Sequence, residues 1–319
     1  MSQASSHQAV VRIGSRASRL AQAQAFQMQA AIAAALGAPP DEAGVVAPVT
    51  LFSTAGDRIL DRRLLEIGGK GLFTEEIEAA LLDGRIDCAV HSLKDMPAEP
   101  PEGLVIAATP EREDVRDAFL SHGFERFEDL PPGARLGTAS LRRQTQALYR
   151  RPDLQPVLLR GNIDTRLAKL DRGDADGIIL AYAGLRRLGL QDRARQLFDP
   201  LERPTAPGQG ALAIETRVQD AGSSWVRALD HAPTALCIAA ERGALMAMEG
   251  SCRTAMGAYA FLQDGAVDLV VEALTPDGRD RFRRQGRLEG ADRAGAEALG
   301  RTLGEQIAAE GGERLLLKT

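Results

Sequence analysis

Short apolar runs alternate with stretches of helical periodicity over the first two thirds of the chain. The runs that predict strands cover 9–14, 45–53, 86–90, 135–138, 157–159 and 177–181. The stretches that predict helices, several of them closed by glycine, cover 18–36, 74–82, 140–151 and 165–172. Strands that alternate with helices in this way indicate doubly wound, mostly parallel sheets, and we expect two successive units of this α/β kind.

The pattern changes in the last third of the chain. A helix is predicted over 234–248, and the β-like runs that follow it are separated by two turns, Asp264-Gly265 and Asp277-Gly278. Asp-Gly between apolar runs is a hairpin signal. A final helix is predicted over 291–310. This part of the chain is therefore expected to form a small α+β domain with an antiparallel sheet.

The boundaries follow from the linker-like segment 204–210, rich in Pro and Gly, and from a further predicted strand at 211–215 that can return to the first unit. We expect a first α/β lobe of 9–112 with a return segment of 208–228. A second α/β lobe then covers 113–207, and an α+β domain covers 229–319.

The composition is that of an ordinary globular protein, with 44% hydrophobic and 26% charged residues. A net charge of −5 disfavours a nucleic-acid-binding protein, which is usually basic. No apolar run reaches the roughly 20 residues of a membrane span, and the first ten residues hold no apolar signal core. Three scattered cysteines are too few for a disulfide framework or a zinc site. We expect a cytoplasmic protein that uses no metal.

Positive charge gathers in the second predicted lobe, where eleven basic residues stand against five acidic ones between Arg135 and Leu190. The arginines near predicted helix N-termini are Arg16, Arg19, Arg142, Arg143, Arg160 and Arg166. A cation there opposes the helix dipole by about 0.3–1 kcal/mol, whereas the free N–H groups favour an anion. The repetition indicates a multiply charged anion beyond the carboxyl ends of the strands. The alternative is that each arginine is solvated at the surface.

The sequence also bears on the class of that anion. It contains neither a Walker A motif nor a Gly-x-Gly-x-x-Gly run after a strand, which disfavours a nucleotide. Guanidinium forks bind carboxylates as readily as phosphates. A polycarboxylate is therefore the favoured ligand.

Two of the lysines stand where chemistry is possible, and the chain has only four lysines among 39 basic residues. Lys94 and Asp95 follow a buried strand in a tight turn, where a carboxylate beside an ammonium can act as general acid and base. The alternative is a surface ion pair of little energetic weight. Lys70 lies in the glycine-rich run 68–71, which can approach a ligand closely or form a lid.

One cysteine differs from the other two in its neighbours. Cys252 stands beside Arg253, and a neighbouring cation lowers the pKa of a thiol, so Cys252 is a candidate nucleophile. The alternative is a buried, inert cysteine. Cys88 and Cys237 lie among apolar residues and are expected to pack as small hydrophobes. The four histidines are isolated and show no metal-ligand spacing.

Seven runs in this order make the sequence resemble a known family. They are GSRASRLA at 14–21, GGKGLF at 68–73, HSLKDMP at 91–97, GTASLRRQ at 137–144, RGNIDTRL at 160–167, PGQG at 207–210 and EGSC at 249–252. Together they closely resemble the porphobilinogen deaminase, or hydroxymethylbilane synthase, family over nearly the whole chain. The departures from the family's usual runs include Ala139, Arg253 and Ala255.

The resemblance implies a transferase of tetrapyrrole and haem biosynthesis. Enzymes of this family join four porphobilinogen units head to tail, release ammonia each time, and finally hydrolyse off hydroxymethylbilane. The resemblance implies a dipyrromethane cofactor held by a thioether at Cys252, and Asp95 as the catalytic carboxylate. It also implies a cytoplasmic monomer whose partner is a small molecule, with no nucleic acid, membrane or metal.

The resemblance assigns further residues to cofactor and substrate binding. They are Arg16, Ser18, Lys70, Ser92, Lys94, Thr138, Ser140, Arg142, Arg143, Arg160, Arg166, Arg187 and Gln209. The implied fold is a pair of doubly wound lobes of the bilobed, type II periplasmic-binding-protein-like kind, plus the small α+β domain. The alternative function is a non-catalytic, bilobed protein that binds a polycarboxylate.

Overall fold

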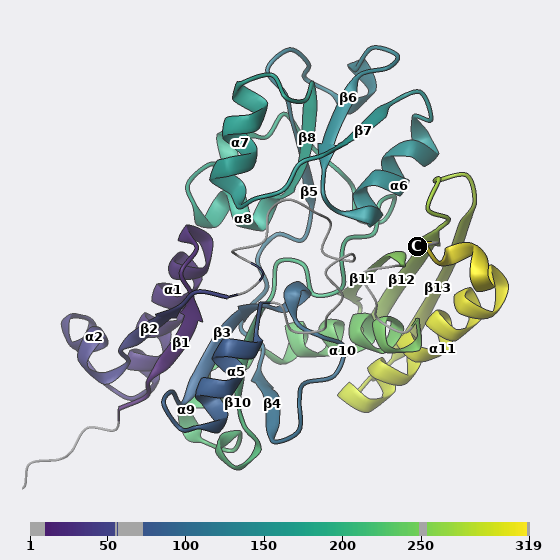
Figure 1. Cartoon of the computed structure of the whole chain (residues 1–319). Coiled ribbons are helices and arrows are strands. Elements are labelled where there is room, and N and C mark those ends of the chain that lie inside the picture. The colour runs from purple at the N-terminus through teal and green to yellow at the C-terminus, as the bar shows by residue number, and fades with distance from the viewer. Residues whose placement is uncertain (1–9, 55, 57–72, 249–253, 318–319) are drawn as a thin grey trace, which may run out of the picture.

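The computed structural model, which describes residues 10–54, 56, 73–248 and 254–317, contains three sheets in that part of the chain (Figure 1). The first sheet has the order β2-β1-β3-β10-β4. Its strands are β1 (Ile13–Arg16), β2 (Val49–Phe52), β3 (Cys88–Ser92), β4 (Leu104–Ala108) and β10 (Leu212–Arg217). β1 is parallel to β2 and β3, whereas β10 is antiparallel to β3 and β4.

The second sheet repeats this arrangement, with the order β7-β6-β8-β5-β9. Its strands are β5 (Asp117–Leu120), β6 (Arg135–Thr138), β7 (Gln155–Leu158), β8 (Gly177–Ala181) and β9 (Gln196–Leu197). β6 is parallel to β7 and β8, and β5 is antiparallel to β8 and β9. In each sheet the antiparallel fourth strand arrives from the other lobe, so β5 and β10 are crossover strands. This topology confirms the bilobed, doubly wound fold expected from the sequence.

Helices cover both sheets. The first lobe carries α1 (Arg19–Ala35), α2 (Ala43–Val46), α5 (Glu75–Leu82) and α9 (Ser224–Leu229), with the 3₁₀ turns η1 (Pro40–Glu42), η2 (Leu93–Asp95) and η5 (Val218–Asp220). The second lobe carries α6 (Leu141–Arg150), α7 (Ile163–Asp171) and α8 (Tyr182–Arg187), with η3 (Phe127–Asp129) and η4 (Gln191–Arg193). The apolar face of α1 packs through Met28 and Ile32 against Val90 and Ile214, which places one core between helix and sheet.

The two crossover segments touch where the lobes meet. Glu113 N donates to Gly210 O at 3.2 Å. Gly210 has φ +89°, and a Cβ atom there would lie 2.4 Å from Glu113 O. Only glycine accommodates both the left-handed backbone and this close approach. The residues just before β5 and just before β10 are therefore held side by side.

The third sheet is antiparallel, with β11 (Ala255–Gln263), β12 (Ala266–Leu274) and β13 (Arg281–Glu289), as the two Asp-Gly turns predict. Asp264 and Gly265 both have positive φ, which suits the two-residue hairpin between β11 and β12. α10 (Ala232–Ala247) and α11 (Arg293–Gly311) pack together beside it, followed by η6 (Gly312–Leu315). At Gly300 a Cβ atom would lie 1.9 Å from Ala240 O, so these helices are in close contact.

Several sequence predictions were wrong in detail. The predicted strand 45–53 begins as helix α2 instead, because Val46 turns into the core beside α1 and the strand starts only at Val49. The strands β4, β5 and β9 were not predicted. β4 pairs with β10, and β5 pairs with β8 and β9, so each of these strands depends on a partner that is distant in the sequence, and local periodicity carries little sign of them. The predicted strand 9–14 overlaps β1 only at Ile13 and Gly14, and the other predicted helices and strands differ from the observed ones only at their ends.

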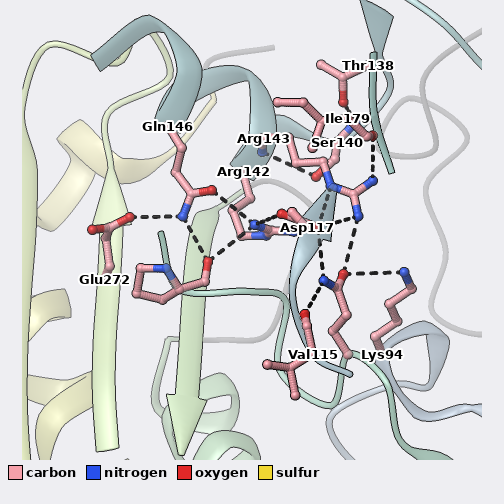
Figure 2. Close-up of polar contacts among 12 residues, drawn as sticks. Lys94, Val115, Asp117, Thr138, Ser140, Arg142, Arg143, Gln146, Ile179 and Glu272 are labelled. Carbon is pink, nitrogen blue, oxygen red and sulfur yellow. Dashed lines mark hydrogen bonds and ion pairs between the residues drawn. The ribbon is translucent and has the colours of Figure 1, made fainter. Parts of the chain in front are cut away.

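Polar contacts tie the third sheet and its helices to both lobes. Gln146 of α6 donates to Glu272 of β12 at 3.0 Å (Figure 2). On the other side, Arg242 of α10 donates to Pro97 O at 3.0 Å, just beyond η2. The C-terminal part of the chain is thereby fixed against the two lobes close to where they meet.

Candidate active site

A cavity opens at the carboxyl ends of β1 and β3, between the first turns of α1 and α5. Its polar lining is formed by Arg16, Ser18, Gln24, Thr74, His91, Ser92 and Asp95, and Phe73 is among its apolar lining residues. The structure thus brings together four predicted site residues, namely Arg16, Ser18, Ser92 and Asp95. This is the crevice in which open α/β sheets bind ligands.

The cation and the hydroxyls of this cavity are held in place by their neighbours. The Arg16 guanidinium lies over the Phe73 ring, 4.2 Å from its centroid. Ser18 is the N-cap of α1, where its side chain accepts from Ala21 N. Ser92 exchanges hydrogen bonds with Gln24 of α1 at 2.8 and 3.1 Å. The lining is therefore ordered by helix capping, stacking and side-chain hydrogen bonds.

Lys94 and Asp95 lie in η2 directly after β3, as the sequence predicts, but they form no ion pair with each other in the described part of the chain. Lys94 Nζ instead donates to Gln209 Oε1 at 3.5 Å. The pKa of Lys94 is lowered to about 8, chiefly by burial and then by the Arg143 charge, against the opposing effects of Asp95 and Asp117. Asp95 is exposed and free to meet a ligand in the cavity.

Arg142 and Arg143 lie in the first turn of α6, after the N-cap Ser140. Both are 5% exposed and share the Asp117 carboxylate (Figure 2): Arg142 Nη1 lies 2.8 Å from Oδ2, and Arg143 Nη2 lies 2.8 Å from Oδ1. Burial raises the pKa of Asp117, but the two guanidinium groups lower it well below its usual range. One of the two arginine charges is thus balanced inside the protein.

Arg142 and Arg143 also have partners other than Asp117. Arg142 Nη1 donates to Gln146 Oε1 and to Pro204 O, at 3.0 and 3.2 Å. Arg143 Nη1 donates to Ile179 O at 3.1 Å. Arg143 thus engages all three of its nitrogens within the protein, whereas Arg142 engages Nη1, and its buried Nε has no hydrogen-bond partner among the described residues.

Gln209 and Thr138, two further predicted site residues, are buried. Gln209 is 0% exposed, and its Nε2 donates to Val115 O at 2.7 Å and to Asp117 Oδ1 at 2.9 Å. Thr138 Oγ1 accepts from Ser140 N at 3.1 Å in the turn before α6. Both side chains are therefore held by hydrogen bonds within the protein.

The remaining arginines of the prediction come from the second lobe. Arg166 donates through Nε to Gly161 O at 2.8 Å, and Arg187 donates through Nη2 to Gly210 O at 2.9 Å. Burial lowers the pKa of Arg166 to about 10, and the charges of Arg143 and Arg160 lower it as well, whereas Asp95 of the first lobe raises it. Arg166 of the second lobe thus lies near Asp95 of the first.

Two predicted residues, Lys70 and Cys252, lie outside the described residues. The segment 59–70, which ends at Lys70, lies outside them as well. Cys88 and Cys237 are buried, as predicted. Burial raises the pKa of the Cys88 thiol well above its usual range and that of Cys237 to about 11, so neither is poised as a nucleophile.

The described residues offer neither a metal site nor a membrane-spanning helix. No group of three or more His, Cys, Asp or Glu side chains among them is placed to hold a metal ion. None of their helices combines the length and the apolar character that a membrane crossing requires.

Sequence reasoning missed three polar residues around the site: Asp117, Gln24 and Glu215. Glu215 Oε2 lies 3.1 Å from His91 Nε2, behind the cavity. All three are buried carboxyl or amide side chains, and burial of such groups requires a partner. The only signal in the sequence was a carboxylate at the start of an apolar run, as at Asp117.

The fold and the site define a class of protein: a bilobed α/β protein with cations from both lobes around one exposed carboxylate. Comparison with family models gives two matches, "Porphobilinogen deaminase, dipyromethane cofactor binding domain" over residues 11–224 and "Porphobilinogen deaminase, C-terminal domain" over residues 235–309. The chain belongs to the porphobilinogen deaminase family, as the sequence motifs predict.

Curated relatives support the same family. A porphobilinogen deaminase of Caulobacter vibrioides is 62% identical over 319 residues, covering 98% of this chain and 99% of the relative. One of Phenylobacterium zucineum is 60% identical over 317 residues, covering 97% and 99%. This membership favours the catalytic interpretation over a non-catalytic anion-binding protein, and it brings with it the dipyrromethane cofactor for which the first family domain is described.

Solved structures with more distant similarity include two proteins. One is a nutrient binding protein from Burkholderia cenocepacia bound to methionine, 17% identical with a TM-score of 0.41, covering 69% of this chain and 90% of that one. The other is a pheromone cOB1 precursor/lipoprotein of the YaeC family from Enterococcus faecalis V583. It is 13% identical with a TM-score of 0.44, covering 69% and 90%.

Proposed function

We propose that this protein joins four porphobilinogen units head to tail with release of ammonia and then releases hydroxymethylbilane by hydrolysis. The observation that carries the proposal is the meeting of the two lobes at Gln209 Oε1, which accepts from Lys94 of the first lobe and from Arg143 of the second, next to Asp95 in η2. Each porphobilinogen brings an acetate and a propionate. A site with such a surplus of positive charge suits a ligand with several carboxylates.

Asp95 is the proposed catalytic residue. In each condensation the C–N bond of the protonated aminomethyl group breaks, and neutral ammonia leaves with the bonding electron pair. A C–C bond then forms, and the attacked pyrrole carbon loses its proton. An exposed carboxylate in the cavity can accept hydrogen bonds from pyrrole N–H groups. It can also stabilise the cation that forms as ammonia leaves. It can then take up the proton that restores the aromatic ring.

The substrate carboxylates are proposed to bind the cations and hydroxyls around Asp95. Arg16 and Ser18 lie in the cavity with it, and Lys94 stands beside it in η2. Arg160, Arg166 and Arg187 approach from the second lobe, whereas Arg142, Arg143 and Gln209 act from behind the surface. Binding a carboxylate would offset the cost that burial places on the ammonium and guanidinium charges.

The residues present fit a dipyrromethane, which carries acetate and propionate groups on two rings. The buried and half-buried cations whose pKa values are lowered, such as Lys94, Arg166 and Arg187, are those that gain from anionic neighbours. When bound, this cofactor supplies the pyrrole end to which the first substrate is joined. We propose that Cys252 carries it through a thioether and that Lys70 contacts the bound chain.

The proposal also covers the domain limits and the oligomeric state of the protein. We propose the domain limits given above, with 208–228 returning to the first lobe, and a cytoplasmic monomer that acts on a small molecule without nucleic acid. The pairing of β10 between β3 and β4 supports the return segment. Sedimentation at several concentrations tests the monomer.

The function is tested by incubating the purified chain with porphobilinogen. Consumption of porphobilinogen, release of one ammonia per unit and formation of hydroxymethylbilane are expected. Intact masses of this protein and of Cys252→Ala, measured side by side, should differ by a dipyrromethane in addition to the substitution. A chain that remains unmodified and consumes no porphobilinogen would reduce the protein to a binder.

A further inference from the structure

Asp117 lies where the chain passes from one lobe to the other, as the first residue of the crossover strand β5. It is 3% exposed. Its carboxylate accepts from Arg142 Nη1 at 2.8 Å, from Arg143 Nε and Nη2 at 3.1 and 2.8 Å, and from Gln209 Nε2 at 2.9 Å (Figure 2). One buried carboxylate thus joins helix α6 to the segment just before the second crossover strand, β10.

Gln209 carries this arrangement forward to Lys94. Its Nε2 has two acceptors, Asp117 Oδ1 and Val115 O. Its Oε1 has two donors, Arg143 Nη2 at 3.3 Å and Lys94 Nζ at 3.5 Å. Lysine and arginine only donate and a carboxylate only accepts, so the amide has one orientation that satisfies every partner. The carboxylate of Asp117 is part of what turns Oε1 toward Lys94.

Asp117 also sets the balance of charge around Lys94. The charged groups that act on this ammonium are Arg142 and Arg143 of α6, Asp95 of η2 and Asp117 of β5. Burial and the two arginines lower the pKa of Lys94 to about 8, and Asp95 and Asp117 raise it. Without the Asp117 charge, Lys94 would face two guanidinium groups with only the exposed Asp95 to oppose them.

We propose that Asp117 is a positioning residue for the reaction, which acts through Gln209 to hold the Lys94 ammonium in place and balances the two arginines behind it. The proposal rests on the proposed function in so far as Lys94 binds a substrate carboxylate. Asp117 itself touches no substrate, because Arg142, Arg143 and Gln209 surround it.

The test is Asp117→Asn in the full chain with its cofactor. The readout is the pH dependence of reductive methylation at Lys94, followed peptide by peptide. The chain has only four lysines, so Lys94 is easily resolved from the rest. The midpoint for Lys94 is expected to fall by about one pH unit, and the KM for porphobilinogen is expected to rise about tenfold. A folded variant with an unchanged midpoint and an unchanged KM would overturn the proposal.

Glu272→Gln is the matched control. Glu272 is also a buried carboxylate linked to α6, where it accepts from Gln146 at 3.0 Å and pairs with Arg283 at 3.3 Å, but it is not among the charges that chiefly shift the pKa of Lys94. This variant should lose stability and keep the Lys94 midpoint. A midpoint that falls equally in both variants would show general loosening and overturn the proposal.

Gln209→Met keeps the proposal testable if Asp117→Asn does not fold. It removes the link to Lys94 and leaves the Asp117 charge in place. The KM for porphobilinogen is expected to rise. The Lys94 titration midpoint is expected to shift by less than half as much as in Asp117→Asn. An unchanged KM would contradict the positioning role. If Asp117→Asn shows the expected shift in the Lys94 midpoint but the unsubstituted protein consumes no porphobilinogen, the proposed function is wrong. The positioning of Lys94 by Asp117 would still stand.

Discussion

The Arg112 guanidinium, in the segment between β4 and β5, forms a bidentate ion pair with the Glu241 carboxylate of α10, with N–O distances of 2.7 and 2.9 Å. Glu241 is 0% exposed, and it also accepts from Gly208 N at 2.7 Å and from Ala260 N at 2.9 Å. One side chain therefore joins the link between β4 and β5, the loop before β10 and strand β11.

Removing one partner of this buried pair should be costly. Glu241→Gln leaves the Arg112 charge buried without its carboxylate, and we expect a loss of about 3–5 kcal/mol in the free energy of unfolding. Urea denaturation measures it. Glu297→Gln is the control, since its i,i+4 pair with Arg301 is exposed and should contribute less than about 0.5 kcal/mol. Equal losses in the two variants would contradict the role of Glu241 as a junction.

Asp95→Asn should separate folding from chemistry. The exposed amide keeps the shape of the carboxylate but can neither balance a cation nor take up a proton. We expect kcat for ammonia release to fall by about 10²–10⁴-fold, with an unchanged far-ultraviolet circular dichroism spectrum. Single-turnover measurement of porphobilinogen consumption provides the rate. Near-normal ammonia release from a folded variant would exclude Asp95 as the catalytic carboxylate.

Substrate affinity should depend on pH through Lys94. Its pKa is lowered to about 8, so the ammonium is present below that pH and is lost as the pH rises through it. The KM for porphobilinogen is expected to rise between pH 7 and 9.5 as the positive charge disappears. Lys94→Arg remains charged throughout this range. Its KM, whatever its starting value, should lack that rise; a parallel rise in both proteins would assign the titration to another group.

The contact between α10 and α11 gives a prediction whose sign is informative. By helix propensity alone, Gly300→Ala would stabilise α11 by about 1 kcal/mol. A Cβ atom at this position would lie 1.9 Å from Ala240 O and 2.8 Å from Ala244 N, so the helices would have to separate. We expect a net loss of about 1–3 kcal/mol. Thermal unfolding measures whether Gly300→Ala stabilises or destabilises the protein. A raised Tm would show that α10 and α11 can separate at little energetic cost.

The parts of the fold that the sequence predicted are those written in local patterns. Strand β8 coincides with the predicted run 177–181, because a short apolar segment between Asp176 and a helix has little freedom. The Asp264-Gly265 turn was predicted from two residues, since both need positive φ. By contrast, β4 and β5 depend on partners that arrive late in the chain, and no local pattern encodes those partners.

The same reasoning applies to the site. Ser18 and Ser140 stand first in the predicted helices 18–36 and 140–151, and each is the N-cap of the observed helix. The partnership of Asp117 with Arg142 could not be predicted, because it joins positions 25 residues apart through the order of strands in the second sheet. Local motifs place the arginines near helix ends, and only the topology supplies the carboxylate between them.

The crossover strands also determine when each sheet can be completed as the chain leaves the ribosome. The second sheet needs nothing beyond β9, which ends at Leu197. The first sheet needs β10, which ends at Arg217 and lies between β3 and β4. The lobe that begins the chain is therefore the later of the two α/β lobes to close. Until Arg217 has emerged, the exposed edges of β3 and β4 have no strand to join them.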